Sequence, residues 1–336
     1  MPTPLRVAAL SFWHVHAGDY CRQATEHPGT ELVAVWDADA DRGREAAAER
    51  GVAFEAELSE VLARGDVDAV IVTTPTVDHR DVMVAAARAG KHVFTEKLLA
   101  PTVAECEEII AATDEAGVQL TVSLPFLQRG HVRAIAAQLA EGTIGDPGYV
   151  RVRMSHDGAV RDWLPERFYD PAEAVGGALT DLGCHPAYLT QLFLGAEPDT
   201  VSATYRSLTH RAVEDHAVVT LGYPDQRIGV VEAGFASRTP FTMEVYGTEG
   251  ALTWSARDST LWRQLGRGEW EAVELPPHEP TPFVSWVDHI AAGTRADDNL
   301  ARAVELTRLV VAANESAASG RTVAYQARGA GEGGQP

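Results

Sequence analysis

Lys97, Asp181 and His185 are the residues of this chain best suited to moving a proton. Lys97 directly follows the apolar stretch HVFT, which predicts a β-strand, so its side chain lies at a strand's carboxyl end, where α/β sheets bind ligands. There an ammonium group can hydrogen-bond a substrate hydroxyl and ease removal of its proton, and burial lowers the pKa of such a lysine. A surface lysine paired with Glu96 is the alternative that the residues leave open.

Asp181 and His185 are four residues apart, a spacing that places two side chains on one face of an α-helix. A carboxylate beside an imidazole fixes its tautomer and raises its basicity, which suits a general base near neutral pH. The preceding Gly176 and Gly177 permit a close approach of the chain at the helix entry. Two alternatives stay open: an ordinary pair on a solvated helix, and a metal site for which no third ligand is evident.

The stretch LRVAALSFWHVHAGDY resembles the first strand and turn of a dinucleotide-binding fold, but its turn has no glycine. Alignment with G-x-G-x-x-G places Ser11, Trp13 and His16 at the glycine positions. Because the Trp13 ring would clash on the usual turn, we expect a shifted turn and a helix that starts near His16 or Ala17. The helix N-terminus still attracts phosphate, and Ser11, His14 or His16 would add donors. His14 and His16 share one face of an extended segment, but nothing in the sequence completes a metal shell around them.

Five further positions are expected to line the dinucleotide. Asp37 ends the second predicted strand, where an acid binds the adenosine ribose hydroxyls and repels a 2′-phosphate, which favours NAD over NADP. An aspartate in a turn or helix cap is the competing interpretation. Thr74 and Pro75 form the turn after the third strand, while His79 caps the next helix or reaches the ribose and is assigned no chemistry. Glu96 completes this set.

The first third of the chain alternates short apolar strands with helices, and this pattern predicts a parallel sheet covered on both faces, the doubly wound Rossmann arrangement. The strands are expected at 6–10, 31–37, 68–75, 91–97 and 119–124, and the helices at 17–27, 40–50, 79–90 and 102–116.

After about residue 124 the pattern changes to period-2 alternation, over 148–157 and 200–254, which predicts a large, open, mostly antiparallel sheet. A long amphipathic helix is expected over 301–320. The predicted organisation is a dinucleotide-binding domain, an α/β domain for substrate binding and oligomerisation, and a disordered tail, over residues 1–123, 124–325 and 326–336.

The composition limits the partners of the protein. Its 336 residues include 28 Lys and Arg against 48 Asp and Glu, a formal net charge of −20, which argues against nucleic-acid and membrane partners. Cys21, Cys106 and Cys184 lack metal-ligand spacing and indicate reduced thiols. Because we find neither a signal peptide nor an apolar run near the ~18 residues of a membrane span, we expect a cytoplasmic protein. No candidate ligand set is complete, so we also expect no metal.

Two motifs resemble the Gfo/Idh/MocA family, which includes glucose–fructose oxidoreductase and inositol dehydrogenase. The stretch TTPTVDHRDVMVAAARAGKHVFTEKLLAPTVAECEEI follows the family's TP…H…A…AGKHV…EKP string, with Leu98 in place of the usual proline, and GGALTDLGCHPAYL follows GG…D.G.H. The resemblance covers about residues 5–324 and implies a Rossmann domain followed by an α/β domain whose open sheet often mediates dimers or tetramers. It also implies that Lys97 is catalytic, that His185 takes the hydroxyl proton and that Asp181 orients or assists it.

The leading expectation is therefore an NAD(P)-dependent dehydrogenase of a sugar, cyclitol or related polyol, in which a bound dinucleotide takes the hydride. One alternative is redox-neutral elimination or glycoside cleavage with a retained dinucleotide. Another is a non-catalytic ligand-binding or regulatory protein, for which the missing glycines and Leu98 are the motivation.

Overall fold

The structure of the protein is a computed structural model that describes residues 3–326, so all but the first residue of the predicted tail lies outside the described part. The chain divides into two compact units. The N-terminal unit comprises Met1–Pro125 and Pro280–Thr307, and the C-terminal unit comprises Phe126–Glu279 and Arg308–Pro336. The segment Pro280–Thr307 therefore lies with the first unit, although its place in the sequence groups it with the second.

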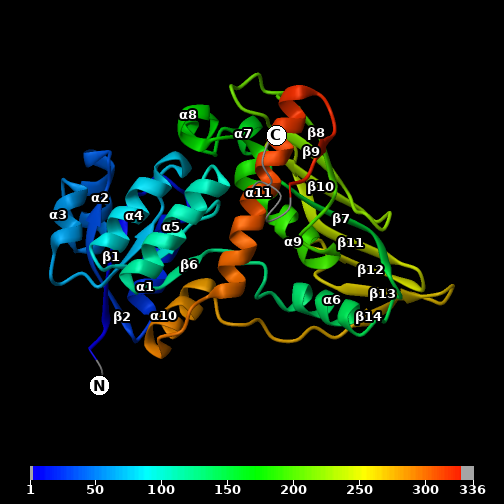
Figure 1. Cartoon of the computed structure of the whole chain (residues 1–336), viewed down its shortest axis with the longest axis horizontal. Helices are drawn as coiled ribbons and strands as arrows, with labels where there is room; N and C mark the ends of the chain where they lie inside the picture. The colour runs from blue at the N-terminus through cyan, green and yellow to red at the C-terminus, as the bar shows by residue number, and fades with distance from the viewer. Residues whose placement is uncertain (1–2, 327–336) are drawn as a thin grey trace, which may run out of the picture. The chain divides into compact units, whose positions relative to one another are not determined.

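The N-terminal unit contains the predicted parallel sheet, in the order β3-β2-β1-β4-β5-β6 (Figure 1). Its strands are β1 (Leu5–Leu10), β2 (Thr30–Trp36), β3 (Ala53–Glu55), β4 (Ala69–Val72), β5 (His92–Thr95) and β6 (Leu120–Val122). All neighbouring strands in this sheet pair in parallel. The strand order reverses between β1 and β4, and the carboxyl ends of strands at such a reversal form the usual ligand crevice of an open α/β sheet.

Helices connect these strands and cover both faces of the sheet. They are α1 (Ala17–Glu26), α2 (Ala40–Arg50), α3 (Leu58–Ala63), η1 (Thr76–Asp78), α4 (His79–Arg88), α5 (Val103–Ala116), α10 (Pro282–Ala292) and the beginning of α11 (Asp297–Ser319). The elements predicted for the first third are confirmed to within a few residues. The elements β3, α3 and α10 have no counterpart among the ranges that the sequence pattern predicts. Val7 and Ala9 lie in apolar clusters on one face of the sheet, and Ala8 and Leu10 on the opposite face are also completely buried.

The short helix α10 joins this core from far along the sequence. Phe283 and Trp286 are fully buried, and their rings contact the ring of Phe94 in β5 at centroid distances of 5.6 and 5.7 Å. Thr281 caps the helix and Pro282 occupies its first turn, so the local sequence fixes where α10 begins. The apolar spacing of Phe283, Trp286 and Val287 then gives α10 one face to bury against the sheet.

The C-terminal unit is built on a nine-stranded sheet in the order β14-β13-β12-β11-β7-β10-β9-β8-β15. Within the described residues, β10 and β7 are the one parallel pair of this sheet and the other pairs are antiparallel, so the prediction of a mostly antiparallel sheet is confirmed. The strands are β7 (Pro147–Ser155), β8 (Thr200–Arg206), β9 (His216–Gly222), β10 (Ile228–Gly234), β11 (Thr239–Gly247), β12 (Gly250–Ser255), β13 (Leu261–Leu265), β14 (Glu271–Val273) and β15 (Val323–Ala324).

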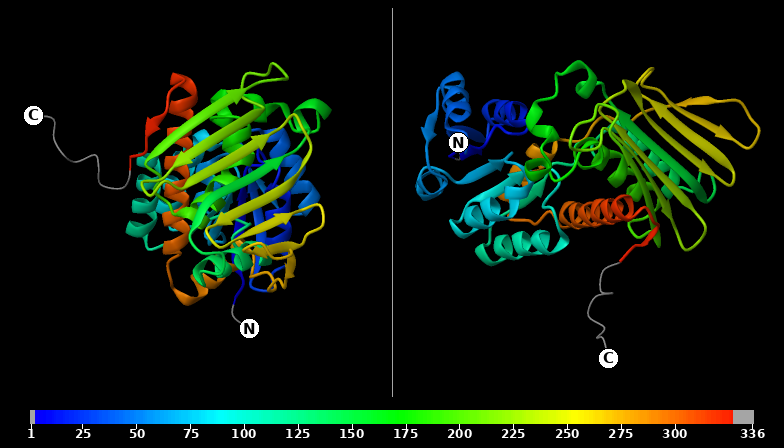
Figure 2. Two further views of the ribbon diagram at one scale, coloured as in Figure 1. Left: turned by 90° about the vertical axis from the view of Figure 1, so that its right-hand side faces the viewer. Right: turned by 90° about the horizontal axis from the view of Figure 1, so that it is seen from above.

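The two faces of this sheet differ. One is covered by a π-helical turn, η3 (Leu179–Gly183), and by α9 (Cys184–Leu194), and in the view that looks onto the other face no helix lies in front of the strands (Figure 2). Along β7, Val150 and Val152 are buried whereas Arg151 and Arg153 are half-exposed. The remaining helices of the unit are α6 (Gly130–Ala140), α7 (Gly158–Arg161), η2 (Glu166–Tyr169) and α8 (Pro171–Ala174). Within residues 3–326, no helix is both long and apolar enough to cross a membrane.

Candidate active site

The turn after β1 adopts the conformation of a glycine turn without a glycine. Ser11 has a φ of 78°, in the left-handed region that favours glycine. Its backbone N–H donates to Trp36 O at 2.6 Å, its carbonyl accepts from the Thr73 hydroxyl at 2.6 Å, and its Oγ accepts from the Trp13 N–H at 3.1 Å. These bonds hold a residue that would otherwise disfavour this conformation by about 1–2 kcal/mol.

Between Ser11 and α1 the backbone follows a path that differs from that of the glycine-rich turn. Trp13 is 4% exposed, so its ring turns into the protein. The His14 N–H donates to Thr73 O at 3.1 Å, and α1 begins at Ala17, as predicted. The clash expected for Trp13 on an unchanged turn is therefore avoided by a shifted one.

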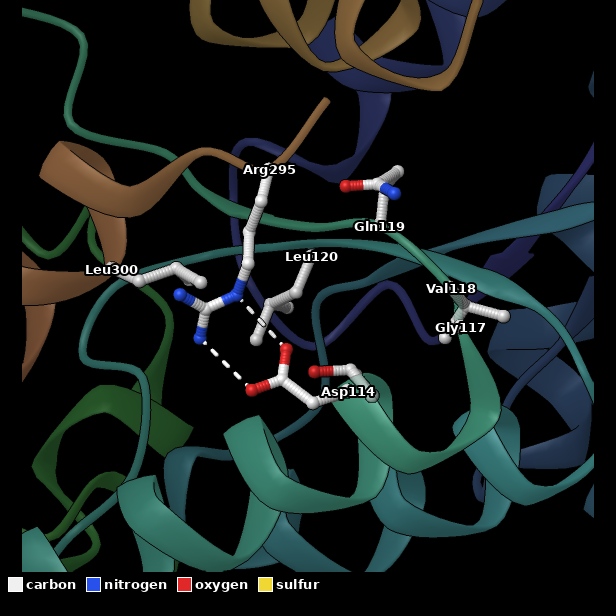
Figure 3. A pocket seen from close by; sticks show the side chains of 8 residues that line it. Asp114, Gly117, Val118, Gln119, Leu120, Arg295 and Leu300 are labelled. Atoms are coloured by element: carbon white, nitrogen blue, oxygen red, sulfur yellow. Dashed lines mark hydrogen bonds and ion pairs between the residues drawn. The ribbon is translucent and has the colours of Figure 1, made fainter. Parts of the chain in front are cut away.

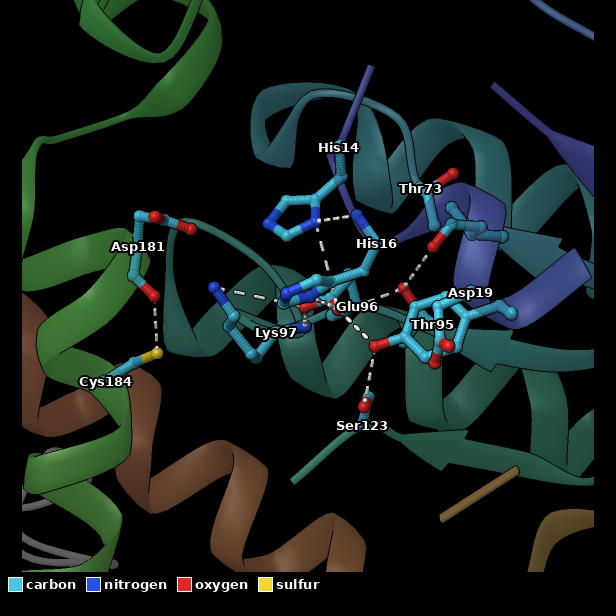
Figure 4. Close-up of polar contacts among 12 residues, drawn as sticks. His14, His16, Asp19, Thr73, Thr95, Glu96, Lys97, Ser123, Asp181 and Cys184 are labelled. Atoms are coloured by element: carbon cyan, nitrogen blue, oxygen red, sulfur yellow. Dashed lines mark hydrogen bonds and ion pairs between the residues drawn. The ribbon is translucent and has the colours of Figure 1, made fainter. Parts of the chain in front are cut away.

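Glu96, directly after β5, is the centre of a buried polar cluster (Figure 4). It is 2% exposed, and its two oxygens face different partners. Oε1 lies 2.8 Å from His16 Nδ1 and 3.9 Å from His14 Nδ1, and it accepts the hydroxyl of Tyr20. Oε2 accepts the Lys97 N–H at 3.0 Å and lies 4.0 Å from Lys97 Nζ.

The charges around Glu96 decide its protonation. Burial by itself raises the pKa of a carboxyl, but His14, His16 and Lys97 together hold the pKa of Glu96 well below its usual range. Tyr20 behaves in the opposite sense, because burial and the Glu96 charge raise the pKa of its phenol well above the usual value. The cluster therefore contains an ionised carboxylate and a neutral phenol.

Lys97 is 4% exposed, so the interpretation as a surface lysine is wrong, although its pairing with Glu96 is present. The Lys97–Leu98 peptide bond is cis, at the position where the resembled family usually has proline. His79 does not cap α4: its buried Nδ1 lies 2.8 Å from Leu98 O and 3.2 Å from Leu99 O. Burial lowers the pKa of His79, so the imidazole is neutral and fixes the backbone that follows the lysine.

Tyr20 and Ser123 belong to this cluster, and sequence reasoning missed both. The Tyr20 hydroxyl lies 2.8 Å from Ser123 Oγ, which follows β6. A signal for Tyr20 did exist, because His16 and Tyr20 are four residues apart at the start of a predicted helix and so share a face. No local pattern indicates Ser123, because only the sheet order brings β6 beside β5.

The Asp37 side chain binds backbone N–H groups in nearby turns, which is the competing interpretation that the sequence left open. Its carboxylate accepts the N–H groups of Phe12 at 2.6 Å and Asp39 at 2.9 Å. Arg42 donates to both oxygens, from Nε at 2.8 Å and from Nη2 at 2.6 Å. These four bonds match the roughly four acceptor positions of a carboxylate. The helix cap itself is Asp39, whose side chain accepts the N–H groups of Asp41 and Arg42.

Thr74 and Pro75 follow β4, at the same edge of the sheet. Thr74 is 3% exposed, and its Oγ1 has no hydrogen-bond partner within the part of the chain that the structure describes. An unsatisfied buried hydroxyl is costly, so its presence at this edge fits a site that a ligand completes.

In the C-terminal unit, Asp181 and His185 do not lie on one regular α-helix. Asp181 is in the π-helical turn η3, and His185 is in the first turn of α9, so the α-helical geometry assumed for this pair is wrong. His185 is 5% exposed, its Nδ1 lies 3.2 Å from the Tyr188 hydroxyl, and its ring meets Phe126 edge-on at 5.0 Å. A π-turn at this point accords with the frequent occurrence of such turns at functional sites.

A partly buried glutamate holds the entry to this turn. Glu214 accepts the Gly177 N–H at 3.0 Å and the Leu179 N–H at 2.9 Å, and burial raises the pKa of its carboxyl. A Cβ on Gly177 would lie 2.1 Å from Glu214 O, and one on Gly176 would lie 2.1 Å from Thr180 Oγ1. The close chain approach predicted for the two glycines is therefore confirmed.

A separate pocket lies at the other edge of the parallel sheet (Figure 3). It is lined by the end of α5, the residues that lead into β6, and Arg295, which pairs with Asp114 at 2.9 and 3.0 Å. Because Gln119 and Leu120 stand at the amino end of β6, this pocket is remote from the carboxyl ends that carry Ser11, Thr74 and Glu96.

Comparisons with known proteins find matches for each of the two units. Residues 15–124 match a model described as "Oxidoreductase family, NAD-binding Rossmann fold", and residues 132–253 match the GFO/IDH/MocA C-terminal domain. The chain is 32% identical to 1,5-anhydro-D-fructose reductase of Ensifer adhaerens, over 67% of this chain and 68% of that protein.

A second relative, scyllo-inositol 2-dehydrogenase (NAD(+)) of Bacillus subtilis (strain 168), is 31% identical over 74% of this chain and 71% of its own length. Among solved structures, GenD2 from gentamicin A biosynthesis in complex with NAD is similar at 27% identity with a TM-score of 0.83. That similarity covers 97% of this chain and 98% of GenD2.

The role of Tyr20 in holding the Glu96 cluster is testable by removing its hydroxyl. We expect Y20F to lower the free energy of unfolding by about 1–3 kcal/mol, because buried partners lose a hydrogen bond. S319A removes a hydroxyl from an exposed side chain at the end of α11, where it binds Ser316 O at 3.3 Å, and it should stay within about 0.5 kcal/mol of the parent. Urea unfolding followed by circular dichroism measures both, and equal stability of Y20F and the parent would contradict the role.

Proposed function

The chain belongs to the Gfo/Idh/MocA family of oxidoreductases, and from this premise we propose that it is an NAD(P)-dependent dehydrogenase of a sugar, cyclitol or related polyol. The observation that carries the proposal is the buried pair of Lys97 and ionised Glu96 at the carboxyl edge of the parallel sheet. The names of the two relatives, a reductase of an anhydro sugar and a dehydrogenase of an inositol, support the substrate class.

A nicotinamide dinucleotide, when bound, supplies the hydride acceptor or donor. Three features of the N-terminal unit fit it: the left-handed Ser11, the positive end of the α1 dipole, and the unsatisfied Thr74 hydroxyl. We assign to the cofactor the residues around these features, namely Ser11, Trp13, His14, His16, Asp37, Thr74, Pro75, His79 and Glu96, with Asp37 acting through its negative charge because its acceptor positions are already occupied.

Lys97 is proposed as the group that binds the reacting oxygen. It is one of two lysines in a chain with 28 Lys and Arg, so almost every other cationic side chain is an arginine. A lysine ammonium is a compact charge on a flexible stem, whereas a guanidinium is a planar fork that stays protonated. The Lys97 ammonium, 4.0 Å from the Glu96 carboxylate, donates to the substrate oxygen and stabilises it as its proton leaves.

His185 is proposed as the base that accepts the hydroxyl proton during oxidation and returns it during reduction, with Asp181 assisting. The Tyr188 hydroxyl at 3.2 Å fixes the orientation of the imidazole, and Glu214 holds the backbone from which the π-turn starts. These contacts support a preorganised base, because a catalytic side chain gains from neighbours that lock its rotamer.

The preference for NAD rests on the surroundings of Asp37. Protein donors already occupy the acceptor positions of the Asp37 carboxylate. Because Arg42 is one of these donors, its guanidinium is paired with Asp37 and does not offer a binding site for a 2′-phosphate. Asp39 and Asp41 add negative charge beside it, at 54% and 98% side-chain exposure. A 2′-phosphate would meet this charge without an unpaired guanidinium to offset it.

We expect NADH to bind at least about tenfold more tightly than NADPH, a difference of about 1.4 kcal/mol. Titration of the purified protein with each dinucleotide, followed by tryptophan quenching and energy transfer to the nicotinamide, measures this. R42A is the informative variant. Equal or tighter NADPH binding by the parent, lost in R42A, would show that Arg42 reads the 2′-phosphate and would overturn the preference.

Replacement of Lys97 tests the chemistry separately from binding. We expect K97R and K97M to lower kcat by about 10²–10⁴-fold on the best substrate from a panel of aldoses, cyclitols and anhydro sugars, because either change removes the ammonium. Dinucleotide affinity should change little. K91R is the matched control, since the Lys91 Nζ binds the carbonyls of Arg64 and Val67 at the amino end of β5. Normal turnover by K97R would exclude a specific role for the lysine.

We further propose that copies of the chain associate through the uncovered face of the nine-stranded sheet. Tyr149 and Tyr246 pair there at a ring distance of 5.9 Å, beside the ion pair of Arg151 and Glu232. Light scattering should find a dimer or tetramer that Y246R weakens at least about tenfold, because the added charge is buried unpaired. W163R, in the loop after α7, should have no effect, and a monomeric parent would contradict the proposal.

A further inference from the structure

The histidine pair that the sequence left without a third ligand acquires one in the folded protein. The ligand atoms of His14, His16 and Glu96 all lie within 4.8 Å of one another (Figure 4). Glu96 is 80 residues beyond His16 in the sequence and reaches the pair only because β1 and β5 end at the same edge of the sheet. We propose that these three side chains bind one divalent transition-metal ion of the Zn²⁺ class.

The donor set suits such an ion. Two imidazole nitrogens and one carboxylate oxygen form the protein ligands of many zinc sites that keep an open fourth position. Two ligands of one tetrahedral Zn²⁺ stand roughly 3.3 Å apart, because each bond is about 2.0–2.1 Å long. The present separations of 2.8 and 3.9 Å from Glu96 Oε1 to His16 Nδ1 and His14 Nδ1 lie on either side of that value. Small side-chain rotations therefore suffice.

The hydrogen bonds of the two imidazoles indicate where the electron pairs lie. His14 Nδ1 accepts the backbone N–H of His16 at 3.2 Å, so this nitrogen carries a lone pair, and a bound ion would replace that N–H as its partner. His16 Nδ1 shares a proton with Glu96 Oε1 at 2.8 Å. An ion placed between these two atoms displaces that proton, which is released as in other metal sites with imidazole ligands.

The Lys97 ammonium and the proposed ion contact different oxygens of Glu96. Lys97 contacts Glu96 through Oε2, whereas both histidines face Oε1. The carboxylate therefore stands between the ammonium and the proposed ion, and it attracts both. Tyr20 supplies a hydrogen bond to Oε1, the kind of second contact that orients a ligating carboxylate.

The cluster is also accessible. The side chain of His16 is 46% exposed, whereas those of His14 and Glu96 are buried at 5% and 2%. An ion can therefore approach past His16 and then be held by two ligands that are already fixed. Cys21, Cys106 and Cys184 are all buried, so surface thiols within the described residues do not offer a competing site.

The test is a metal titration of tag-free, chelator-treated protein without dinucleotide. Co²⁺, followed by its visible d–d absorption, and Zn²⁺, followed by calorimetry, are the probes. We expect one ion per chain, with affinity lowered at least about tenfold in H16A and in H14Q, since each loses a direct ligand. H289A is the matched control, because His289 belongs to the same unit but binds the Thr294 hydroxyl, and its affinity should equal that of the parent.

Absence of stoichiometric binding to the folded parent, or undiminished binding in both histidine variants, would refute the site. Circular dichroism shows whether each variant folds, and the half-exposed position of His16 makes H16A the safer one. The proposal does not rest on the proposed oxidoreductase activity. NADH titration of the same samples keeps the two apart, because loss of metal binding alone and loss of dinucleotide binding alone are separate results.

Discussion

The buried carboxylate of Glu96 is the constraint on which the N-terminal unit depends. A charge at 2% exposure is stable only when other charges and donors surround it, and the four partners of Glu96 come from three separate parts of the chain. His14 and His16 come from the turn after β1, Tyr20 from α1, and Lys97 from the chain directly after β5. The carboxylate thus ties the first turn, the first helix and the lysine into one arrangement, which explains how Lys97 is held in the interior.

The same arrangement explains how a dinucleotide fold dispenses with its glycines. A glycine turn is needed because the backbone must enter the left-handed region and let a helix start close to the strand. Here Ser11 enters that region while Trp36, Thr73 and Trp13 bind its backbone and hydroxyl. Asp37 then holds the next N–H, that of Phe12. Hydrogen bonds to the backbone and hydroxyl of Ser11 take the place of the conformational freedom of glycine.

The C-terminal unit uses a partly buried acid for a comparable purpose. Glu214 binds the N–H groups at the start of the π-turn, where the two glycines allow the chain to pass close to β9 and its preceding loop. The π-turn then leads into α9, whose first turn contains His185. In both units a glutamate carboxylate binds backbone N–H groups next to the chemistry-bearing residues.

The sequence by itself determined the elements and the motifs. Apolar runs and helical periodicity located β1, β2, α2 and α5 almost to the residue, because local burial and capping set where such elements begin and end. Motif spacing likewise singled out Lys97 and His185. Contacts between distant segments were decided only by the tertiary structure. The place of α10 in the first unit, the bond of Tyr20 to Glu96, and the meeting of His14 and His16 with Glu96 depend on strand order. Sequence periodicity reports which face of an element is buried, whereas strand order decides what that face meets.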